Sequence, residues 1–390
     1  MLGIGYTVRR YDWGSLQAIP DLLGVEPDGR PWAELWFGDH ESGPSALVEP
    51  GGVGFHLDGL IHRDPATALG PDHARWGDRL PYMLKVLGVA APLSLQVHPG
   101  RERAREGFAR EEAAGVPLDA PHRSYRDPRP KPEMVFALSR FEALAGLRPA
   151  TEARAALEGL DAPLARKMAA SLEGPGALRR TMASVLGDET SPAAVDGLVA
   201  ACACRRREGT GDVAAYSLVA RLAAHYPADP GVAASLLMRH VVLAPGEALA
   251  VPTGMLHAYL EGLAVEVLGA SDNVLRAGLT PKHRDVPELL GAMDDAHTAA
   301  PRPREVRDGP VRRFLPPFED FQLIDVRVDG PVGIDVPGPR IGLVLSGAVF
   351  AAAGGHTRRV EPGQGVFVLG SDGPLRVHGA GRLIVAAPGK

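Results

Sequence analysis

A short segment early in the chain, Pro92-Leu-Ser-Leu-Gln-Val-His-Pro99, carries two side chains that could bind a metal ion. Apolar runs bounded by Gly and Pro predict strands here. On a strand, Gln96 and His98 point to the same face, because side chains alternate with a period of two. A ring nitrogen and an amide oxygen on one face could share a metal ion. The alternative is a surface histidine beside a strand end.

A second segment, residues 246–257, follows the pattern G-x5-P-x-G-x2-H. It resembles the second signature of the cupin superfamily, which are small β-barrels that hold a metal ion inside. The physical reasons are that Pro252 ends a strand, Gly254 allows a tight turn, and His257 is then aimed into the barrel. The usual pattern continues to an asparagine, and Glu261 occupies that position here.

Further blocks make the chain similar to a known family, the type I mannose-6-phosphate isomerases (phosphomannose isomerases). The blocks occur in the order typical of the family and span about seven tenths of the chain, residues 11 to 282. Lys-Pro-Glu and Ser-Asp-Asn-x-x-Arg-Ala-Gly-Leu-Thr are the most specific. The blocks that carry the resemblance are residues 11–15, 33–40, 80–86, 92–99, 127–134, 141–149, 245–262 and 271–282.

This resemblance implies one Zn²⁺ per chain, bound by four side chains: Gln96, His98, Glu133 and His257. Two neutral ring nitrogens, a carboxylate and an amide oxygen suit zinc. Mn²⁺, Co²⁺ or Fe²⁺ are chemically possible. One departure from bacterial relatives is Arg129, where histidine is usual.

The resemblance also implies an aldose–ketose isomerase that interconverts mannose 6-phosphate and fructose 6-phosphate through an enediol. Such a reaction needs a base for the C2 proton and stabilisation of negative charge on O1 and O2. The positions that match the family's catalytic residues are Lys131, Asp272 and Arg276. Lys131 could move protons beside a dication, and Arg276 could stabilise enediolate or phosphate charge.

Three further residues are expected to bind the sugar phosphate: Lys85, Ser94 and Lys282. The two lysines are candidates for the phosphate, where lysine acts as a point charge. Each could also be an ordinary solvated side chain.

Two other functions remain open. Two histidines and a carboxylate on a cupin barrel can bind Fe²⁺ for oxygen chemistry, although Gln96 and the neighbouring cations argue against it. A non-catalytic cupin that binds a sugar phosphate is the other alternative. Nothing resembles a Gly-rich nucleotide-binding segment, so nucleotidyl transfer is not expected.

The fold class that must position these residues is mainly β with an α-helical insertion. We expect a cupin-type catalytic barrel from residues 1–148 and 241–300, with a helical domain at 149–240. Residues 301–390 should form a second cupin-like barrel. Gly363 follows a proline in this unit as Gly246 does in the first barrel. The position that corresponds to His257 is then occupied by Pro374, so no metal is expected there.

Periodicity supports this division. Strand-like runs occur at Ala33–Gly38 and Leu80–Val97, and again at Phe321–Val328, Ile341–Leu345, Gly365–Leu369 and Leu383–Val385. Between them, apolar residues recur at helical spacing (Leu164, Met168, Leu172; Leu178, Met182, Leu186), which predicts four or five helices. Ser191-Pro192 has the pattern of a helix start. Residues 286–293 could form one more helix, and residues 300–308 read as a charged, Pro-rich linker.

Composition excludes other classes. Of 390 residues, 42 are basic and 47 acidic, so electrostatic binding to nucleic acid or to an anionic membrane is not expected. No apolar stretch reaches the length of a membrane span. Cys202 and Cys204 are too few for a disulfide framework and are expected on a helix. A cytoplasmic, monomeric enzyme is predicted.

Overall fold

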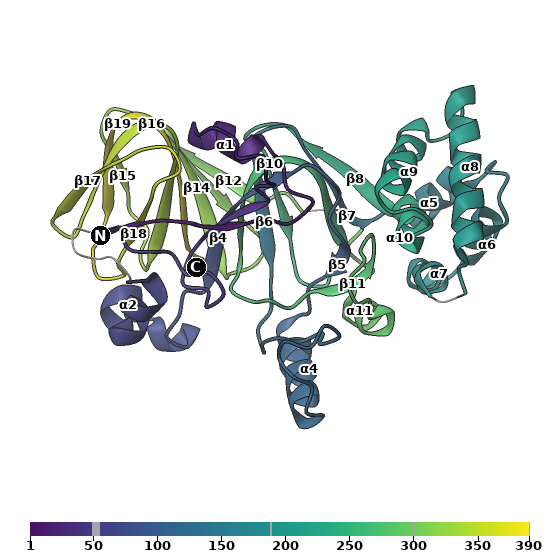
Figure 1. The fold of residues 1–390 in the computed structure, drawn as a ribbon, viewed down its shortest axis with the longest axis horizontal. Coiled ribbons are helices and arrows are strands. Elements are labelled where there is room, and N and C mark those ends of the chain that lie inside the picture. The colour runs from purple at the N-terminus through teal and green to yellow at the C-terminus, as the bar shows by residue number, and fades with distance from the viewer. Residues whose placement is uncertain (49–54, 188, 300, 390) are drawn as a thin grey trace.

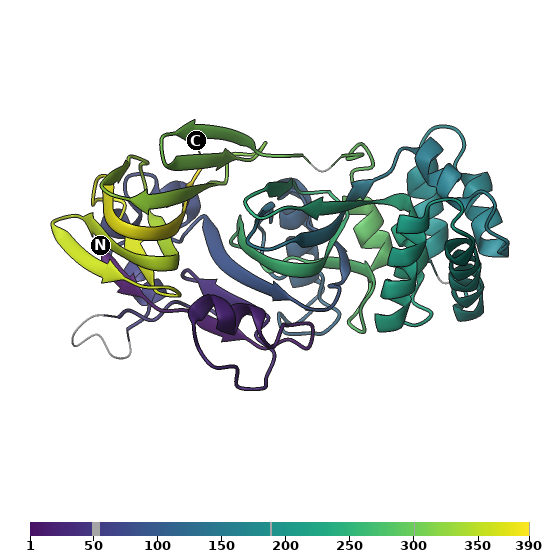
Figure 2. The same cartoon turned by 90° about the horizontal axis from the view of Figure 1, so that it is seen from above.

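Three parts of the chain lie side by side along the long axis of the molecule (Figures 1 and 2). The computed structural model describes residues 1–48, 55–187, 189–299 and 301–389. A β unit occupies the centre, with the yellow-green C-terminal strands at one end and the teal helices at the other. The predicted fold class, mainly β with a helical insertion, is confirmed.

The central unit contains ten strands in the described part of the chain. Strand β10 is its spine, because it pairs antiparallel with four others. The strands predicted from the two early apolar runs are confirmed by β3, β4 and β5. The bounds are β2 (Thr7–Arg9), β3 (Glu34–Phe37), β4 (Tyr82–Val89), β5 (Leu95–Val97), β6 (Glu133–Ala137), β7 (Phe141–Leu147), β8 (Met238–Leu243), β9 (Ala248–Val251), β10 (His257–Gly269) and β11 (Leu275–Gly278).

A β-bulge in β10 decides which of its side chains face the inside of the barrel. The register against β7 shifts just after Tyr259, and Gly262 adopts a positive φ of 122° close to the neighbouring backbone. A shift by one residue reverses the alternation of faces. Ala264 therefore packs with Tyr259 inside the barrel, and Val265 packs on the outer face. Glu266 shares the inner face with Ala264.

The second sheet has nine described strands, and its first strand comes from the other end of the chain. β1 pairs with β18, so Leu2–Ile4 lies in the C-terminal unit although the rest of the N-terminal segment lies in the central one. The four strands predicted for this unit are confirmed. The bounds are β1 (Leu2–Ile4), β12 (Arg304–Asp308), β13 (Val311–Leu315), β14 (Phe321–Asp329), β15 (Val332–Ile334), β16 (Arg340–Ala353), β17 (His356–Val360), β18 (Gly365–Val368) and β19 (Leu375–Pro388).

The prediction of a linker over residues 300–308 is wrong for most of the segment. Strand β12 pairs with β13 from Arg304 to Asp308 while all five of its side chains are exposed. Residue 300 lies outside the described residues. β12 lies at an edge of the sheet, where charged side chains protect a strand from pairing with other molecules. The same charges made the segment resemble a linker.

The helical insertion contains six described α-helices, more than the four or five predicted. One of the six is the short helix α10, in which Pro230 occupies the first turn, where its missing N–H is not needed for helical hydrogen bonds. Ser191 caps α8 as predicted, since its hydroxyl accepts a hydrogen bond from the Ala194 amide. The predicted helix at residues 286–293 is confirmed by α11. The bounds are α5 (Ala150–Leu157), α6 (Pro163–Ser171), α7 (Ala177–Leu186), α8 (Pro192–Glu208), α9 (Val213–His225), α10 (Pro230–Ala234) and α11 (Val286–Ala292).

The remaining helices cover the two sheets, and the core between the sheets is apolar. The Phe136 and Phe314 rings meet edge to face at 5.2 Å across it. The Tyr82 hydroxyl donates to carbonyls of the C-terminal unit at 2.8 and 3.0 Å. Helix α4 projects from the central unit (Figure 1). The bounds are α1 (Ala18–Leu23), α2 (Leu57–Arg63), α3 (Pro65–Leu69), the 3₁₀ turns η1 (His73–Trp76) and η2 (Ser235–Leu237), and α4 (Arg101–Ala113).

Among the described residues, none of the helices has both the length and the apolar character needed to cross a membrane. The division into three domains stays a prediction. Strand β1 departs from the predicted boundaries, because it lies in the first segment of the chain but pairs with β18 of the C-terminal unit. Both cysteines lie on α8, Cys202 buried and Cys204 exposed.

A buried carboxylate joins the helical insertion to the central barrel. Glu142 on β7 accepts hydrogen bonds from Arg221 of α9, from Arg140, and from His240 of β8 at 2.9 Å. Arg221 also pairs with Glu261 of β10 at 3.0 Å. Position 261, where the cupin signature would have asparagine, therefore belongs to this network and not to the metal site.

This network makes a testable contribution to stability. Burial opposes ionisation of Glu142, but the three donors outweigh it and lower the pKa to about 2. Because the folded pKa lies below the ordinary value near 4.5, the stabilisation is fully present above about pH 4.5 and is lost as the pH falls towards 2. We expect Glu142→Gln to lower the free energy of unfolding by about 1–3 kcal/mol at pH 7.

Denaturant unfolding of both proteins between pH 7 and pH 2.5 measures this effect. The difference between them should shrink at the acid end of the range. A difference that stays constant with pH would exclude the ionised carboxylate as its cause.

Candidate functional site

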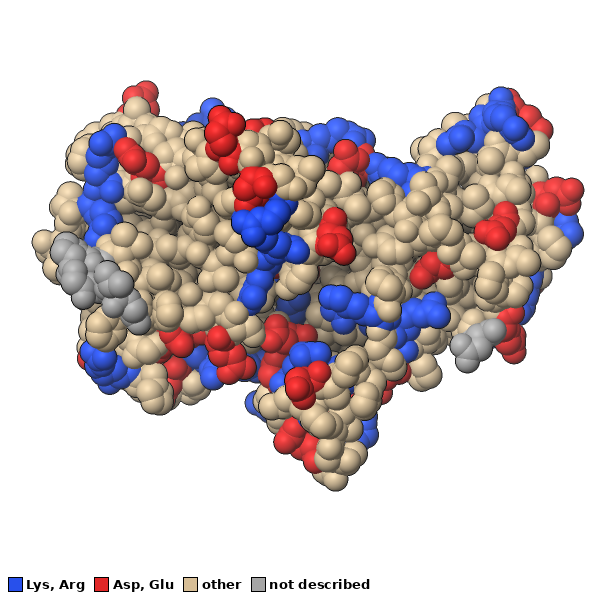
Figure 3. All heavy atoms as spheres, in the orientation of Figure 1, with Lys and Arg blue, Asp and Glu red and all other residues tan. Residues whose placement is uncertain are grey.

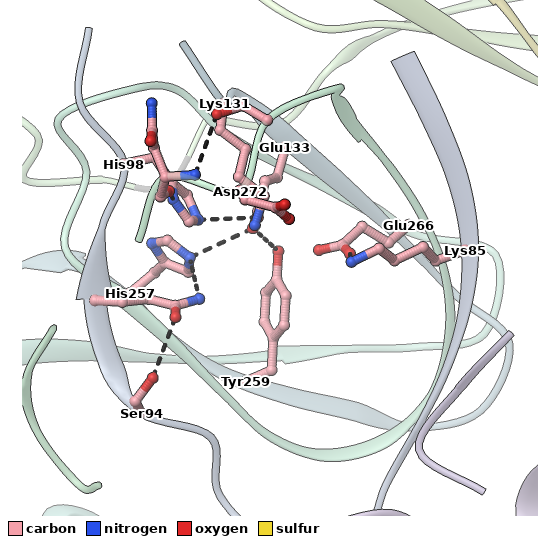
Figure 4. Close-up of polar contacts among 12 residues, drawn as sticks. Lys85, Ser94, His98, Lys131, Glu133, His257, Tyr259, Glu266 and Asp272 are labelled. Atoms are coloured by element: carbon pink, nitrogen blue, oxygen red, sulfur yellow. Dashed lines mark hydrogen bonds and ion pairs between the residues drawn. The ribbon is translucent and has the colours of Figure 1, made fainter. Parts of the chain in front are cut away.

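Three predicted ligand side chains converge inside the central barrel: His98 beyond the end of β5, Glu133 at the start of β6, and His257 at the start of β10 (Figure 4). All three are buried, and their ligand atoms lie within 4.8 Å of one another. The Nε2 atom of His98 is 2.9 Å from Oε1 of Glu133, and that of His257 is 3.4 Å from Oε2. Two nitrogens and a carboxylate thus meet at one point.

Hydrogen bonds orient both imidazoles so that their Nε2 atoms face the carboxylate. Nδ1 of His98 is 2.7 Å from the Asn273 carbonyl oxygen, and Nδ1 of His257 is 3.0 Å from that of Met255. A carbonyl only accepts, so both Nδ1 atoms carry a proton, and in the neutral form of each ring the lone pair is then on Nε2.

These lone pairs need a cation between them. Burial and the Lys131 ammonium lower the pKa of His98 to about 4, so the ring is neutral near pH 7. Its Nε2 atom is buried, and the group that it faces at 2.9 Å is the Glu133 carboxylate, which can only accept hydrogen bonds. Nitrogen lone pairs pointed at a carboxylate repel it unless a positive ion lies between them. The donor set therefore fits a divalent metal, with the carbonyls as the outer partners typical of metal-bound histidines.

Gln96 lies beside this cluster, in the position predicted for the fourth ligand. Its amide is 3.2 Å from Nε2 of His257, and its Oε1 accepts from the Ser94 hydroxyl at 3.2 Å. A half-turn of the amide exchanges its oxygen and nitrogen. Gln96 would then offer its oxygen to the metal and donate N–H to Ser94. Ser94 therefore contacts a predicted ligand, and its predicted role in substrate binding stays a prediction.

Strand pairing explains why Arg276 faces the same space. His257 of β10 lies opposite Gln96 of β5, which in turn lies opposite Arg276 of β11. Directly opposed residues share a face and have Cβ atoms about 4.5–5.5 Å apart. Three neighbouring strands thus place the two ligands and the cation in one row.

Two further groups contact Glu133. Nζ of Lys131 lies 3.0 Å from Oε1, and the Tyr259 hydroxyl donates to Oε2 at 2.9 Å. Burial alone would raise the pKa of Glu133, but Lys131, His98 and His257 together outweigh it and hold the pKa well below its usual range. The expectation that Lys131 and Glu133 share a face is confirmed.

A second row of polar side chains lies deeper in the barrel: Trp36 of β3, Lys85 of β4 and Glu266 of β10 are directly opposed. Nζ of Lys85 is 3.9 Å from Glu266 and 3.4 Å from Glu34. Burial lowers the pKa of Lys85, but the two carboxylates outweigh it and the net shift is upwards. Burial and Glu133 raise the pKa of Glu266 to about 8. Glu266 is therefore a carboxyl group that can hold a proton at neutral pH.

Asp272 lies at the rim, close to Lys131 in Figure 4. Its Oδ2 is 3.2 Å from Nε2 of His40. Burial opposes ionisation, but the hydrogen bond and charge of His40, together with Lys131 and Lys85, outweigh it and lower the pKa of Asp272 to about 2. The carboxylate is ionised at neutral pH.

Three cations gather at the open side of the site: Arg276, Lys282 and Arg126. Burial and Arg126 lower the pKa of Arg276, and burial and Arg276 lower the pKa of Lys282. In the described part of the chain their side chains have no carboxylate partner within ion-pair distance; Nζ of Lys282 lies 5.6 Å from the centre of the Tyr11 ring. Figure 3 shows acidic and basic side chains interspersed over the surface, with Lys and Arg beside the central hollow.

The structure thus brings all the predicted site residues into one region, and it adds others. Sequence reasoning missed Glu34, His40, Arg126, Tyr259, Glu266 and Asn273. The sequence contains only weak indications of these residues. Glu34 lies within the family-like block at residues 33–40, and Asn273 lies within the Ser-Asp-Asn motif at residues 271–273.

A barrel with two histidines and a carboxylate on its inner face, bordered by unpaired cations, defines a metal-binding enzyme of the cupin type. Comparisons with known proteins specify it further. Residues 1–150 match the model of the phosphomannose isomerase type I catalytic domain. Mannose-6-phosphate isomerase of Escherichia coli K12 is 36% identical over 387 residues, which cover 97% of each chain.

Solved structures agree with this result. A phosphomannose isomerase variant from Salmonella typhimurium superposes with a TM-score of 0.90 at 30% identity, covering 100% of both chains. A zinc-bound mannose 6-phosphate isomerase gives 0.89 at 30% identity, covering 100% of this chain and 99% of that one. The chain belongs to the mannose-6-phosphate isomerase family and is an enzyme of that class.

Proposed function

We propose that the protein interconverts mannose 6-phosphate and fructose 6-phosphate through an enediol, with one Zn²⁺ held by Gln96, His98, Glu133 and His257. The observation that carries this proposal is the convergence of two imidazole Nε2 atoms on a buried carboxylate, directly beside cations that have no carboxylate partner among the described residues. The names of the relatives support the substrate, and the zinc-bound structure supports the metal.

The reaction moves the carbonyl group from C1 to C2. A base removes the C2 proton, the bonding pair forms a C1–C2 double bond, and negative charge develops on the carbonyl oxygen. The charged oxygen on C1 then takes up a proton, O2 loses its proton as the C2 carbonyl forms, and return of a proton to C1 gives the ketose. Bound zinc would supply Lewis-acid stabilisation of the charge on these oxygens.

The chain's own residues supply the rest. We assign Arg276 to charge stabilisation, because it is a desolvated cation in the same row as the ligands. Lys131 lies beside Glu133 and can exchange a proton with a substrate oxygen. Asp272, ionised and held by His40, can accept a hydrogen bond from a sugar hydroxyl. Lys85 is already paired with the Glu34 carboxylate at 3.4 Å, so we assign it to a sugar oxygen and not to the phosphate.

We assign the phosphate to Lys282 and Arg126, together with Arg276. A phosphate dianion would relieve the mutual repulsion of these cations. The phosphate is present in ground and transition states alike, so Lys282→Ala and Arg126→Ala should raise KM about 10-fold or more while kcat changes less. Steady-state kinetics with mannose 6-phosphate measure this, with Lys167→Ala on α6 as a control. A lower kcat at unchanged KM would contradict the assignment.

Two experiments test the function itself. The purified protein should contain about one zinc per chain and convert mannose 6-phosphate to fructose 6-phosphate in a coupled assay. Chelation should abolish the activity, and added zinc should restore it. Full activity in a metal-free preparation would refute the zinc assignment.

The second candidate is an Fe²⁺-dependent oxygenase, because two histidines and one carboxylate also suit that chemistry. O₂ uptake by the Fe²⁺-loaded protein without isomerisation would favour it. Sugar-phosphate binding without turnover would favour a non-catalytic cupin. A cytoplasmic location and a monomeric state stay proposals, which cell fractionation and light scattering test.

A further inference from the structure

We propose that Asn273 is a positioning residue that couples the phosphate end of the site to the metal end. This inference rests on the proposed function, because it takes Arg126 as a phosphate-binding residue. Asn273 has no exposed surface and makes no ion pair. Its importance lies in the two segments that it joins: the loop at residues 126–129, which leads into Lys131 and Glu133, and the segment at residues 271–273.

The side-chain amide of Asn273 uses its full hydrogen-bonding capacity on that loop. Its Oδ1 accepts from the backbone N–H groups of Arg126 at 2.7 Å and Asp127 at 3.3 Å. Its Nδ2 donates to the carbonyl oxygens of Asp127 at 2.7 Å and Arg129 at 2.9 Å. An asparagine amide has two donors and two acceptor lone pairs, so all four are satisfied. The loop backbone is thereby held on both edges.

The main chain of the same residue holds a metal ligand. The Asn273 carbonyl accepts from Nδ1 of His98 at 2.7 Å, which sets the orientation of that ring. One residue thus contacts the backbone of Arg126 through its side chain and the imidazole of His98 through its carbonyl.

Asp127 closes the arrangement from the other side. Its Oδ2 accepts from the Ser271 hydroxyl at 3.1 Å and from the Asp272 amide at 2.8 Å. Its Oδ1 accepts from the Arg129 amide at 2.9 Å. The two segments therefore hold each other reciprocally, and a shift of one must displace the other. Buried networks that are fully satisfied in this way are rigid, and they lose that rigidity when one member is removed.

A consequence for the chemistry follows. The distance from phosphate to metal must match the substrate, because small errors in the placement of a reacting group are costly. Asn273 sets this distance within the protein, because it holds both the backbone of Arg126, the cation proposed to bind the phosphate, and the imidazole of the proposed ligand His98.

A double-mutant cycle tests the proposal, with Arg126→Ala, Asn273→Ala and the double variant. Two readouts are independent of turnover: the inhibition or dissociation constant of inorganic phosphate, and the zinc dissociation constant by competition with a chelator. Arg126→Ala should weaken phosphate binding alone. Asn273→Ala should weaken phosphate binding and also zinc binding, the latter by roughly 10–100-fold, as is typical of outer-shell changes. In the double variant, phosphate binding should be no weaker than in Asn273→Ala alone.

Gln322→Ala is the matched control, because Gln322 is a buried amide that donates to the Pro388 carbonyl in the C-terminal unit at 2.9 Å. It should lower thermal stability without changing either constant. If Asn273→Ala does not fold, Asn273→Ser replaces it: this smaller polar side chain also removes the two donations to the Asp127 and Arg129 carbonyls, and should show an effect of the same kind.

Two outcomes would overturn the proposal: phosphate effects that multiply in the double variant, or zinc and phosphate constants within twofold of the unaltered protein in the Asn273 variants. If the unaltered protein showed no isomerase activity while both binding constants changed as expected in the variants, the proposed function would be refuted and the positioning role of Asn273 would stand.

Discussion

Replacement of Glu133 or His257 by alanine is expected to release the metal and to lower isomerase activity by roughly 10²–10⁴-fold. Each change removes one of only four proposed protein ligands, and Lewis-acid stabilisation is worth several kcal/mol of barrier. Loss of Glu133 has a second cost, because it leaves Lys131 and the Tyr259 hydroxyl without their carboxylate. Zinc content by elemental analysis and the coupled assay measure the two effects.

The matched controls are Glu361→Ala and His356→Ala, which remove the same groups from exposed positions in the C-terminal unit. Both should retain zinc and activity. Circular dichroism must show that the ligand variants are folded, since metal binding is coupled to folding energy. A folded Glu133→Ala protein with full zinc content would remove Glu133 from the metal site.

Lys131→Ala and Arg276→Ala are expected to retain the metal but to lose roughly 10²–10⁴-fold in kcat, as is typical of groups that act on protons or developing charge. Neither residue is a proposed ligand, and both lie next to one: Lys131 beside Glu133, and Arg276 opposite Gln96. Zinc analysis and steady-state kinetics on the same preparations separate the two roles.

The conservative variants make this test sharper. Arg276→Lys keeps the charge but loses the planar fork, so it should recover part of the loss if charge is what matters. Normal kcat in both alanine variants would exclude these residues from the mechanism. Loss of zinc in either would show that the residue holds the metal site together.

The metal ligands could be predicted from the sequence because their geometry is local. Gln96 and His98 are two apart on a strand, and the turn residues before His257 aim it at the same space. The helices could be predicted for the same reason, from apolar residues at helical spacing. Local rules failed at β12, where backbone pairing overrides a linker-like composition.

Glu266 shows why other site residues escaped prediction. Counting in twos from His257 places position 266 on the outer face of the strand, and only the bulge after Tyr259 turns it inward. A bulge of this kind depends on the neighbouring strand and leaves little trace in the residues themselves. Asn273 and Arg126 escaped for a related reason, because their contacts join segments that are far apart in the chain.

The pairing of β1 with β18 has a consequence for how the protein is made. Leu2 lies opposite Phe367, so β1 meets its partner only after all the residues between them have been synthesised. Contacts between such distant parts of a chain slow folding, because a very long loop must close first. The C-terminal unit is therefore expected to complete its sheet only after β18 has been made, and a chain cut after residue 300 should expose the apolar face that packs against this unit.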